Sequence, residues 1–566
     1  MNSLILALIM FVGYIVAYHT YGKYLAKKIF KLDPEAVTPA HELRDDIDYL
    51  PTKKEVLFGH HFTSIAGLGP IVGPAIAIIW GWVPAALWIF FGPIFIGAVH
   101  DLSSLVASMR NKGVSIGELT AGLVNPRTRT LFHLIIFFEL WIVIAIFALI
   151  MGILFKMYPQ SVFPVWMEIP IAMWMGYMIY KKGASLTWTA IAAVILMYIT
   201  VIIGAYWPLK LPGLWGLTPV ATWLVILLVY SYFASTLPVW TLLQPRDYIN
   251  AHELIIAMGL LFIGTIIAHP TMVAPAVNAH PAGAPPLWPF IFVIIACGAI
   301  SGFHSLVSSG TSSKQIDKET HAQFVGYGGM LMEGALSVLV IVATAAAIGI
   351  AYKTKAGEVL TGAAAWKAHY ASWQAAAGLG SKLNAVIVGS ANLMGSYGIP
   401  LIIGSTIMAV FLVSFAGTTL DTATRIQRYV IGEFCKDIGA DFLANRWVAT
   451  FIAVFSAFLL AFAQKGGKGA LILWPLFGTV NQLLAGLALL VATVYLAKLK
   501  KPIWFTALPM IFMLLMTGWA MVLNIQKFAK THNTLLFVVG IIVFALEIWM
   551  IIEAIVAIRK ASAQGT

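Results

Sequence analysis

Residues 60–76 read HHFTSIAGLGPIVGPAI, and this stretch decides the fold. It opens an apolar run long enough to cross a bilayer, yet it contains three glycines, two prolines and two histidines. Pro70 removes a helical hydrogen-bond donor, while Gly67 and Gly69 let the backbone leave α geometry at low cost. Inside a bilayer, unsatisfied backbone groups are tolerated only where they line a polar cavity. The stretch therefore predicts a discontinuous membrane helix of the kind that forms midplane sites in secondary transporters.

The composition of the 566-residue chain is typical of a polytopic membrane protein, because 60% of its residues are hydrophobic and only 10% are charged. Apolar runs of about 18 residues or more predict an all-α fold with about 15 transmembrane helices. The first run lacks a basic leader and a small-residue cleavage site, so we expect a retained helix rather than a signal peptide. The expected spans are 2–22, 61–81, 84–108, 131–155, 161–181, 185–207, 219–243, 252–269, 288–309, 330–352, 398–421, 446–464, 471–497, 503–524 and 534–558.

The net charge of +12 reflects membrane topology rather than a nucleic-acid interface. An external N-terminus places 25 of the 35 lysines and arginines on the cytoplasmic side, and every short cytoplasmic loop then obeys the positive-inside rule. An odd number of spans leaves the C-terminus inside. We therefore expect a multi-pass protein of the cytoplasmic (inner) membrane. Its expected partners are the lipid bilayer and a small solute, not nucleic acid, and the sequence does not fix its oligomeric state.

A second interruption is predicted in the span 219–243, where Pro238 falls mid-span behind a cluster of hydroxyl side chains. In this topology helix two runs outward, and this seventh helix, five helices further on, runs inward. Interrupted helices in corresponding positions of oppositely oriented halves indicate an inverted repeat. The pattern favours a LeuT-like five-plus-five core with discontinuous helices 2 and 7. Two unrelated proline kinks in a large bundle are the alternative.

The predicted division of the chain follows from this core. An extracellular loop over 353–397 is long enough for a small lid helix. The acidic residues of the cytoplasmic loop lack a metal-ligand spacing, so a solvated loop is the better interpretation. In chain order the parts are an N-terminal accessory helix (1–22), a cytoplasmic loop (23–58), the transporter core (59–435, with repeats 59–207 and 219–435) and C-terminal accessory helices (436–566).

The interrupted helices supply the expected solute site. If Pro70 begins the outer half of helix two, that half-helix points free N–H groups and a positive dipole end at the midplane, which suits a carboxylate. Helix seven adds hydroxyl and aromatic side chains. The predicted substrate-binding residues are Gly67, Gly69, Pro70, Gly73, Ser231, Ser235, Thr236 and Trp240.

A coupling-ion site is predicted beside the solute. Serines recur along one face of the ninth helix, and their hydroxyls, with freed carbonyls of helix two, suit Na⁺. Histidines titrate nearest physiological pH, so they are the expected carriers if the ion is H⁺. Interhelical hydrogen bonding by the serines, and a capping role for the paired histidines, remain open. The predicted coupling-ion residues are Ile65, Leu68, Ser305, Ser308 and Ser309, and the predicted proton-coupling residues are His60, His61 and His304.

Other ionisable residues within the spans are functional candidates, since charges are costly in a bilayer. Glu139 and Glu547 lie mid-span, whereas Asp101, Glu333 and Asp421 lie near predicted helix ends, where charge costs less. The two cysteines at positions 297 and 435 differ in predicted depth and have no CxxC neighbour, so we expect both to be reduced and structural. No cofactor and no metal beyond a possible Na⁺ is expected.

Several runs resemble the carbon starvation protein A (CstA) family, and together they extend over nearly the whole chain. The resemblance implies an inner-membrane carrier of the amino acid-polyamine-organocation superfamily. It also implies import of small peptides or, in some members, of pyruvate, by ion symport in the carbon-starvation response. The runs are GHHF (59–62), GLGPIVGP (67–74), QPRDY (244–248), GAISGFHS (298–305) with SSGT (308–311), and LWPLFG (473–478) with NQLLA (481–485).

Two other classes remain as alternatives to a carrier. A haem-bearing respiratory subunit would use histidines on facing helices as axial ligands, and a channel would need a continuous selective pore. The sequence contains no Walker A or HExxH motif, so we expect neither ATP-driven transport nor an enzyme.

Overall fold

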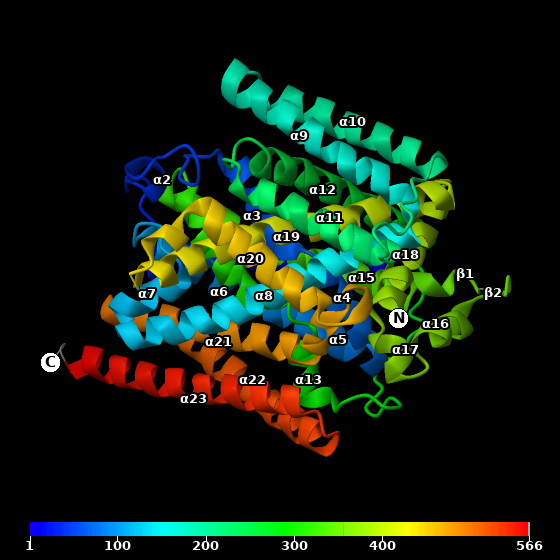
Figure 1. Cartoon of the computed structure of the whole chain (residues 1–566). Coiled ribbons are helices and arrows are strands. Elements are labelled where there is room, and N and C mark those ends of the chain that lie inside the picture. Colours follow the sequence, from blue (N-terminus) through cyan, green and yellow to red (C-terminus); the bar gives the residue numbers. More distant parts are fainter. Residues whose placement is uncertain (355, 438, 564–566) are drawn as a thin grey trace.

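The computed structural model describes residues 1–354, 356–437 and 439–563, whose helices run side by side in one bundle (Figure 1). Apart from isolated bridges, the β-structure of these residues is one hairpin of β1 (Tyr352–Lys353) and β2 (Val359–Leu360). The N-terminus lies near this hairpin, and the last helix, α23 (Thr534–Ala563), ends at the opposite end of the bundle. This placement agrees with an odd number of crossings.

Twelve helical segments of the described residues are long and apolar enough to cross a bilayer, and one bent pair makes thirteen. A multi-pass all-α protein is therefore confirmed. The predicted count of fifteen would also need α20 (Arg446–Phe462) and the pair α13–α14 to cross, which stays a prediction. The twelve are α1 with its π-helical continuation (Ser3–Ile29), α5 with α6 (Trp82–Met109), α8 (Pro126–Met157), α9 (Val162–Lys182), α10 (Leu186–Tyr206), α11 (Pro219–Thr236), α12 (Leu243–Ala268), α15 with the turns before it (Glu319–Gly349), α19 (Leu401–Asp437), α21 (Trp474–Lys498), α22 (Trp504–Lys530) and α23 (Thr534–Ala563).

The interruption of helix two separates α3 (Lys54–Ala66) from α4 (Gly69–Ala77), and the two halves are bent by 40°. Gly67 has φ +42° and ψ −137°, a conformation that side-chain-bearing residues rarely adopt. Pro70 lies in the first turn of α4, where a helix tolerates the missing N–H. The local sequence thus ends one helix and starts the next.

The second interruption lies between α13 (Leu287–Ile294) and α14 (Gly302–Gly310), where residues 295–301 are not helical. The prediction of a mid-span break in 219–243 is wrong, because α11 ends at Thr236 and α12 begins only at Leu243. Pro238 lies in the turn between them, after the extended residue Leu237. A proline disfavours helical geometry in the residue before it, and here it ends a helix instead of kinking one.

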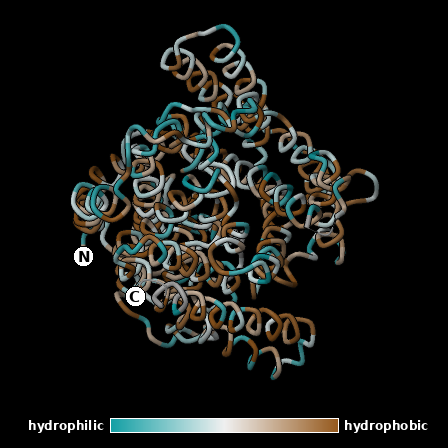
Figure 2. Tube along the Cα trace, turned by 90° about the vertical axis from the view of Figure 1, so that its left-hand side faces the viewer, coloured by the Kyte–Doolittle hydropathy of each residue, from teal (hydrophilic) through white to brown (hydrophobic). Residues whose placement is uncertain are grey.

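The long helices α8 and α19 pack against each other in the middle of the bundle. The α9–α10 hairpin and the α22–α23 pair form two opposite edges in Figure 1. Both edges carry apolar residues along the chain trace (Figure 2), and exposed side chains such as Trp188, Ile195 and Ile552 are apolar. Such an apolar exterior is expected of helices that face lipid.

A small cap covers the end of the bundle where the N-terminus lies. It consists of the β-hairpin with α16 (Gly362–Tyr370), α17 (Trp373–Ala377) and α18 (Leu379–Gly395). The Tyr370 hydroxyl donates a hydrogen bond to the Ala75 carbonyl of α4 at 2.7 Å. The cap is thereby fixed to α4, the second half of the first interrupted helix.

Candidate functional site

The two interruptions pack closely against each other at glycines of α4. A Cβ added to Gly69 would lie 2.3 Å from both Cβ and Sγ of Cys297, and one added to Gly73 would lie 2.6 Å from the Ile294 carbonyl oxygen. Ser337 of α15 donates a hydrogen bond to the Pro70 carbonyl oxygen at 3.0 Å. Glycine is required at position 69 by this close approach rather than by an unusual φ.

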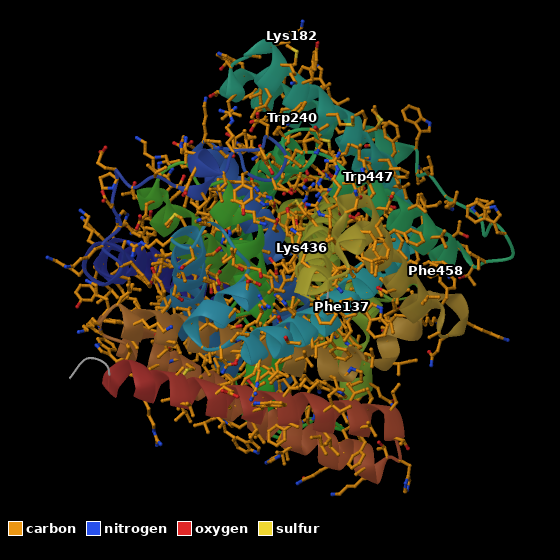
Figure 3. All side chains as sticks on the ribbon, turned by 60° about the vertical axis from the view of Figure 1, so that its left-hand side comes forward. Phe137, Lys182, Trp240, Lys436, Trp447 and Phe458 are labelled. Carbon is orange, nitrogen blue, oxygen red and sulfur yellow. The ribbon has the colours of Figure 1, made fainter. Side chains whose placement is uncertain are left out.

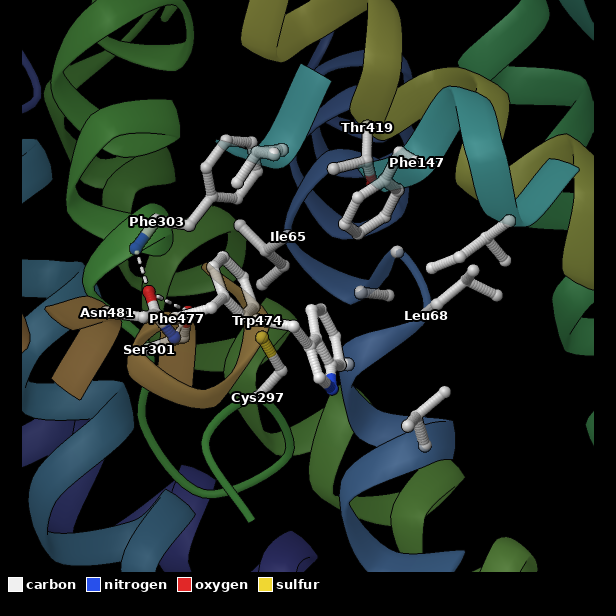
Figure 4. Close-up of a pocket in the computed structure, with 16 residues that line it drawn as sticks. Ile65, Leu68, Phe147, Cys297, Ser301, Phe303, Thr419, Trp474, Phe477 and Asn481 are labelled. Carbon is white, nitrogen blue, oxygen red and sulfur yellow. Dashed lines mark hydrogen bonds between the residues drawn. The ribbon is translucent and has the colours of Figure 1, made fainter. Parts of the chain in front are cut away.

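A cavity of about 50 Å³ lies where the interruptions meet. Its walls come from both breaks and from α8, α19 and α21, with the aromatic rings of Phe147, Trp474 and Phe477 facing inward (Figure 4). Asn481 of α21 accepts a hydrogen bond from the Phe303 N–H at 3.0 Å. The start of α14 is therefore already capped by a side chain, whereas α4 starts at Gly69 with no side-chain cap.

A larger cavity of about 360 Å³ adjoins the small one on the side of the cap. The two share Gly69, Cys297, Trp474 and Asn481, and the larger one extends to Trp373 of α17. In the predicted topology this is the outer side. A solute could therefore reach the interruptions from outside.

At the opposite end of the bundle, the loop before α3 is tied down by charge. Asp48 accepts hydrogen bonds from Arg425 at 2.8 Å and from Arg428 at 3.0 Å, both on α19. Burial acts to raise the pKa of Asp48, but the charges of Arg428 and then Arg425 outweigh it and hold that pKa below its usual value. The expectation of a wholly solvated acidic loop is therefore wrong at Asp48, whose side chain is only 16% exposed.

Some of the residues predicted to bind the solute line the two cavities, whereas others lie away from them. Gly67 and Gly69 line the small cavity, Gly69 and Gly73 line the large one, and Pro70 lies in the first turn of α4 beside them. The residues of helix seven lie elsewhere. The buried hydroxyls of Ser231 and Thr236 donate to carbonyls three residues back, and Ser235 donates to the Asp421 carbonyl.

Trp240 is also away from the cavities. It follows α11 in the turn to α12, and Lys181 lies 4.8 Å from its ring centre. Figure 3 places it just below the α9–α10 hairpin, whose tip carries Lys182. Because α11 ends at Thr236, Trp240 lies in the turn that follows this helix and does not line either cavity.

The predicted coupling-ion residues do not meet at one point. Ile65 and Leu68 line the small cavity, but Ser305, Ser308 and Ser309 of α14 do not. Ser305 and Ser309 donate along their own helix, as short hydroxyl side chains commonly do. The hydroxyl that lies at the first break belongs to α19, where Thr419 Oγ1 would be 2.5 Å from a Cβ at Gly67.

The predicted proton carrier His304 belongs to a fully buried polar cluster. Its Nδ1 lies 3.1 Å from Asp101 Oδ2, and its Nε2 lies 3.3 Å from Glu333 Oε2. His100 Nδ1 lies 2.8 Å from the other oxygen of Asp101. These four side chains, with Cys297 at the second break, are here called the His304 cluster. The four side chains other than Cys297 come from α6, α14 and α15. The sequence analysis considered Asp101 and Glu333 only as separate groups near predicted helix ends.

The second buried group of charges, here called the Arg246 cluster, surrounds the start of α12. Arg246 forms an ion pair with Asp421 of α19 and lies 3.2 Å from Asp247. Glu168 of α9 accepts a hydrogen bond from Ser414 at 2.7 Å and faces the same arginine. Sequence reasoning missed this grouping, although a base and an acid in the QPRDY run were a signal, because intramembrane charges need partners.

The paired histidines lie between these two clusters. His60 Nδ1 is 2.6 Å from Asp247 Oδ2, and its Nε2 is 3.1 Å from Thr311 Oγ1. His61 Nδ1 is 2.9 Å from Ser312 Oγ. A simple capping role does not account for two buried rings that each bond to another helix.

Two interrupted helices that meet at a buried cavity, within a bundle whose exterior is apolar, define a multi-pass membrane transporter. The chain matches the family described as carbon starvation protein CstA over residues 2–520, and it belongs to that family. The expectation drawn from its sequence runs is thereby confirmed.

Among its relatives, a peptide transporter CstA of Campylobacter jejuni is 32% identical, over 92% of this chain and 80% of that protein. The pyruvate/proton symporter BtsT of Escherichia coli is 33% identical, over 90% of this chain and 80% of its own. A solved manganese transporter of Eremococcus coleocola superposes with a TM-score of 0.47 at 13% identity, covering 92% of this chain and 99% of that one. The two relatives, both named as transporters, give no support to a haem-bearing subunit or a channel.

Proposed function

We propose that the protein is a proton-coupled secondary transporter that imports small carboxylates, either pyruvate or short peptides, and that it is not an enzyme. The observation that carries this proposal is the contact of the two interruptions at Gly69 and Cys297, beside a cavity. Relatives named as a peptide transporter and a pyruvate/proton symporter support both solute classes.

The solute site we propose is the small cavity together with the adjoining large one. The large cavity, of about 360 Å³, falls within the range of small-molecule pockets, roughly 300–1,000 Å³. At the start of α4, Pro70 has no N–H and those of Ile71 and Val72 donate to the Leu68 carbonyl. The positive dipole end of this helix is therefore the feature that would favour a carboxylate. Trp474 and Phe477 would form apolar walls for the rest of the solute.

Protons are the coupling ions we propose, held by the histidines and carboxylates of the two buried clusters. His60, His61 and His304 each contact a partner from another helix, and a proton on any of them would change those contacts. The name of the BtsT relative supports H⁺ over Na⁺. None of the three serines predicted to bind Na⁺ lines the small cavity, and Ser305 and Ser309 donate within their own helix, which further favours protons.

We also propose that the LeuT-like repeats begin at the two interruptions, near residues 54 and 287. Each interruption is followed by a helix with a π-helical turn, then by intervening shorter elements, and then by one of the central pair α8 and α19. In the first half the intervening helix is α7 (Ile116–Leu123), and in the second the whole cap, from β1 to α18, intervenes. The second repeat would then start at α13 rather than at residue 219, and the α9–α10 hairpin would be an insertion.

Uptake by proteoliposomes tests the function. Labelled pyruvate and labelled dipeptide should accumulate when the outside is acidic, with or without Na⁺, and their free acids should compete better than esters or amides. Accumulation that needs a Na⁺ gradient and ignores pH would contradict proton coupling. Equal competition by amides and esters would contradict recognition of the carboxylate.

A further inference from the structure

We propose that Cys297, His304 and Glu333 form a binding site for a thiophilic divalent cation, with Zn²⁺ as the reference ion. Cys297 Sγ, His304 Nε2 and a carboxylate oxygen of Glu333 all lie within 4.8 Å of one another. Tetrahedral zinc, at about 2.0–2.3 Å from each ligand, separates ligand atoms by roughly 3.3–3.8 Å. Small side-chain rotations would therefore bring the three atoms to bonding distance.

The donor set and its surroundings fit such an ion. Thiolate, imidazole and carboxylate together favour zinc and similar borderline metals over Na⁺ or Mg²⁺. His304 and Glu333 are fully buried, and the closest polar contact between them is the 3.3 Å ion pair of Nε2 and Oε2. Among the described residues neither these atoms nor Glu333 Oε1 makes a well-aligned hydrogen bond. Buried polar atoms without well-aligned partners are costly, and a cation could coordinate them.

The groups behind the ligands support the same interpretation. Asp101 lies 3.1 Å from His304 Nδ1, and it is itself held by His100 at 2.8 Å. When Nδ1–H donates to this carboxylate, the lone pair of Nε2 faces Glu333 and Cys297. A carboxylate that orients a metal-binding histidine in this way is a recurring feature of zinc sites.

The site is open to the outer side through its cysteine. Cys297 is partly exposed and lines both cavities, so a hydrated ion could arrive through the larger one. Its ligands would join the second interruption to α14 and α15, and Cys297 also abuts Gly69 of the first. Because alternating access needs such elements to move against each other, a bound ion should block transport. This last step rests on the proposed function, whereas binding itself does not.

Metal binding to the purified full-length protein in detergent tests the site directly. Zn²⁺ titrated against a chromophoric chelator should bind one ion per chain, and Co²⁺ should give a near-ultraviolet thiolate-to-cobalt band. Cys297→Ser should abolish that band, and Cys297→Ser and Glu333→Gln should each weaken Zn²⁺ binding about tenfold or more. Cys435→Ser is the matched control, because it removes the only other cysteine and should leave both signals unchanged.

Proton competition gives a second readout of the same site. Metal ligands must be deprotonated, so Zn²⁺ affinity should fall as the pH is lowered. The titratable groups around the ion are Cys297, His304 and Glu333 themselves, with Asp101 and His100 of α6 and His61 of α3.

Two results would overturn the site. One is a wild-type protein that binds no Zn²⁺. The other is binding that survives Cys297→Ser and is lost in Glu433→Gln, which would place the ion at the alternative group of Glu118, His133 and Glu433.

Transport assays then separate this site from the proposed function. External Zn²⁺ should inhibit uptake by the wild type, and it should inhibit Cys297→Ser less, each relative to its own zinc-free rate. Binding without inhibition would refute the block. A wild type that takes up neither pyruvate nor peptide would refute the proposed function while leaving the binding result intact.

Discussion

Replacing Gly69 by alanine tests the contact between the two interruptions. The new Cβ would lie 2.3 Å from Cβ and Sγ of Cys297, well inside van der Waals contact, but 3.6 Å from the Cys297 Cα. The new methyl group therefore collides with the Cys297 side chain. Rotation about χ1 could move the Sγ atom away, but it cannot move the Cβ atom. One of the two backbones must move.

The expected cost of this collision is about 1–3 kcal/mol, the usual penalty for forcing an extra methyl group into a packed core. If the penalty falls on the state in which the interruptions touch, it changes the population of that state by about 5–150-fold. Uptake should fall by a comparable factor. Valine at this position adds a stiff branched side chain and should abolish uptake.

Uptake of labelled pyruvate and dipeptide in proteoliposomes, with thermal unfolding of the same preparations, measures the effect. Gly259→Ala on α12 is the matched control, because nothing lies within 4 Å of a Cβ there. The double variant Gly69→Ala with Cys297→Gly removes both colliding atoms and should recover part of the lost uptake. If the single variant transports normally, or the double variant is no better than the single one, the contact does not limit transport.

Three further perturbations follow from the same structure. Asp48→Asn leaves two buried arginines without their carboxylate, which typically costs about 3–5 kcal/mol. Amide hydrogen exchange across residues 45–52 should therefore become faster. Asp46→Asn, on the exposed surface, is the control and should leave the exchange rates unchanged. Burial lowers the pKa of Lys382 in the cap to about 7 from its ordinary 10.5. Between about pH 7 and 10 the unfolded chain therefore holds a proton that the folded cap has lost, so the free energy of unfolding should rise with pH. Equal slopes of this free energy against pH for the wild type and Lys382→Met would contradict this. Asp247→Asn should reduce proton-driven accumulation while keeping solute counterflow in the folded protein. An unchanged pH dependence of uptake would exclude this residue from coupling.

The sequence carried the first interruption but not the second. Residues 67–74 combine three glycines with two prolines, so a break could be predicted without knowing what packs around it. The second break, over residues 295–301, contains a single glycine and no proline, and it reads as part of a continuous apolar run. Gly298, at φ +93°, is the residue that permits it. Pro238 gave a stronger sequence indication of a second interruption than Gly298 did. Whether a proline kinks a helix or ends it, however, depends on the tertiary packing of the following segment.

The backbone part of the site was accessible from sequence, and its charged part was not. Gly67 and Gly69, which the sequence predicts to bind the solute, line the small cavity, because the same residues that interrupt the helix leave space beside it. Asp101, Glu333 and Asp421 were placed near helix ends, where charge is cheap, but all three are almost completely buried. Their partners lie on other helices, and a helical pattern cannot reveal which helices meet.

The position of the histidine pair explains how one helix could connect both charged clusters. Consecutive residues of a helix point roughly 100° apart, since 3.6 residues make one turn. On α3, His60 accordingly reaches Asp247 of the Arg246 cluster, while His61 lies in the field of Asp101 and His304. Their other contacts are also consecutive, because Thr311 and Ser312 follow directly on α14. A proton gained by either ring would act on the contact between α3 and the end of α14. In the proton-coupled mechanism we propose, this contact changes when the cavity turns from one side of the membrane to the other.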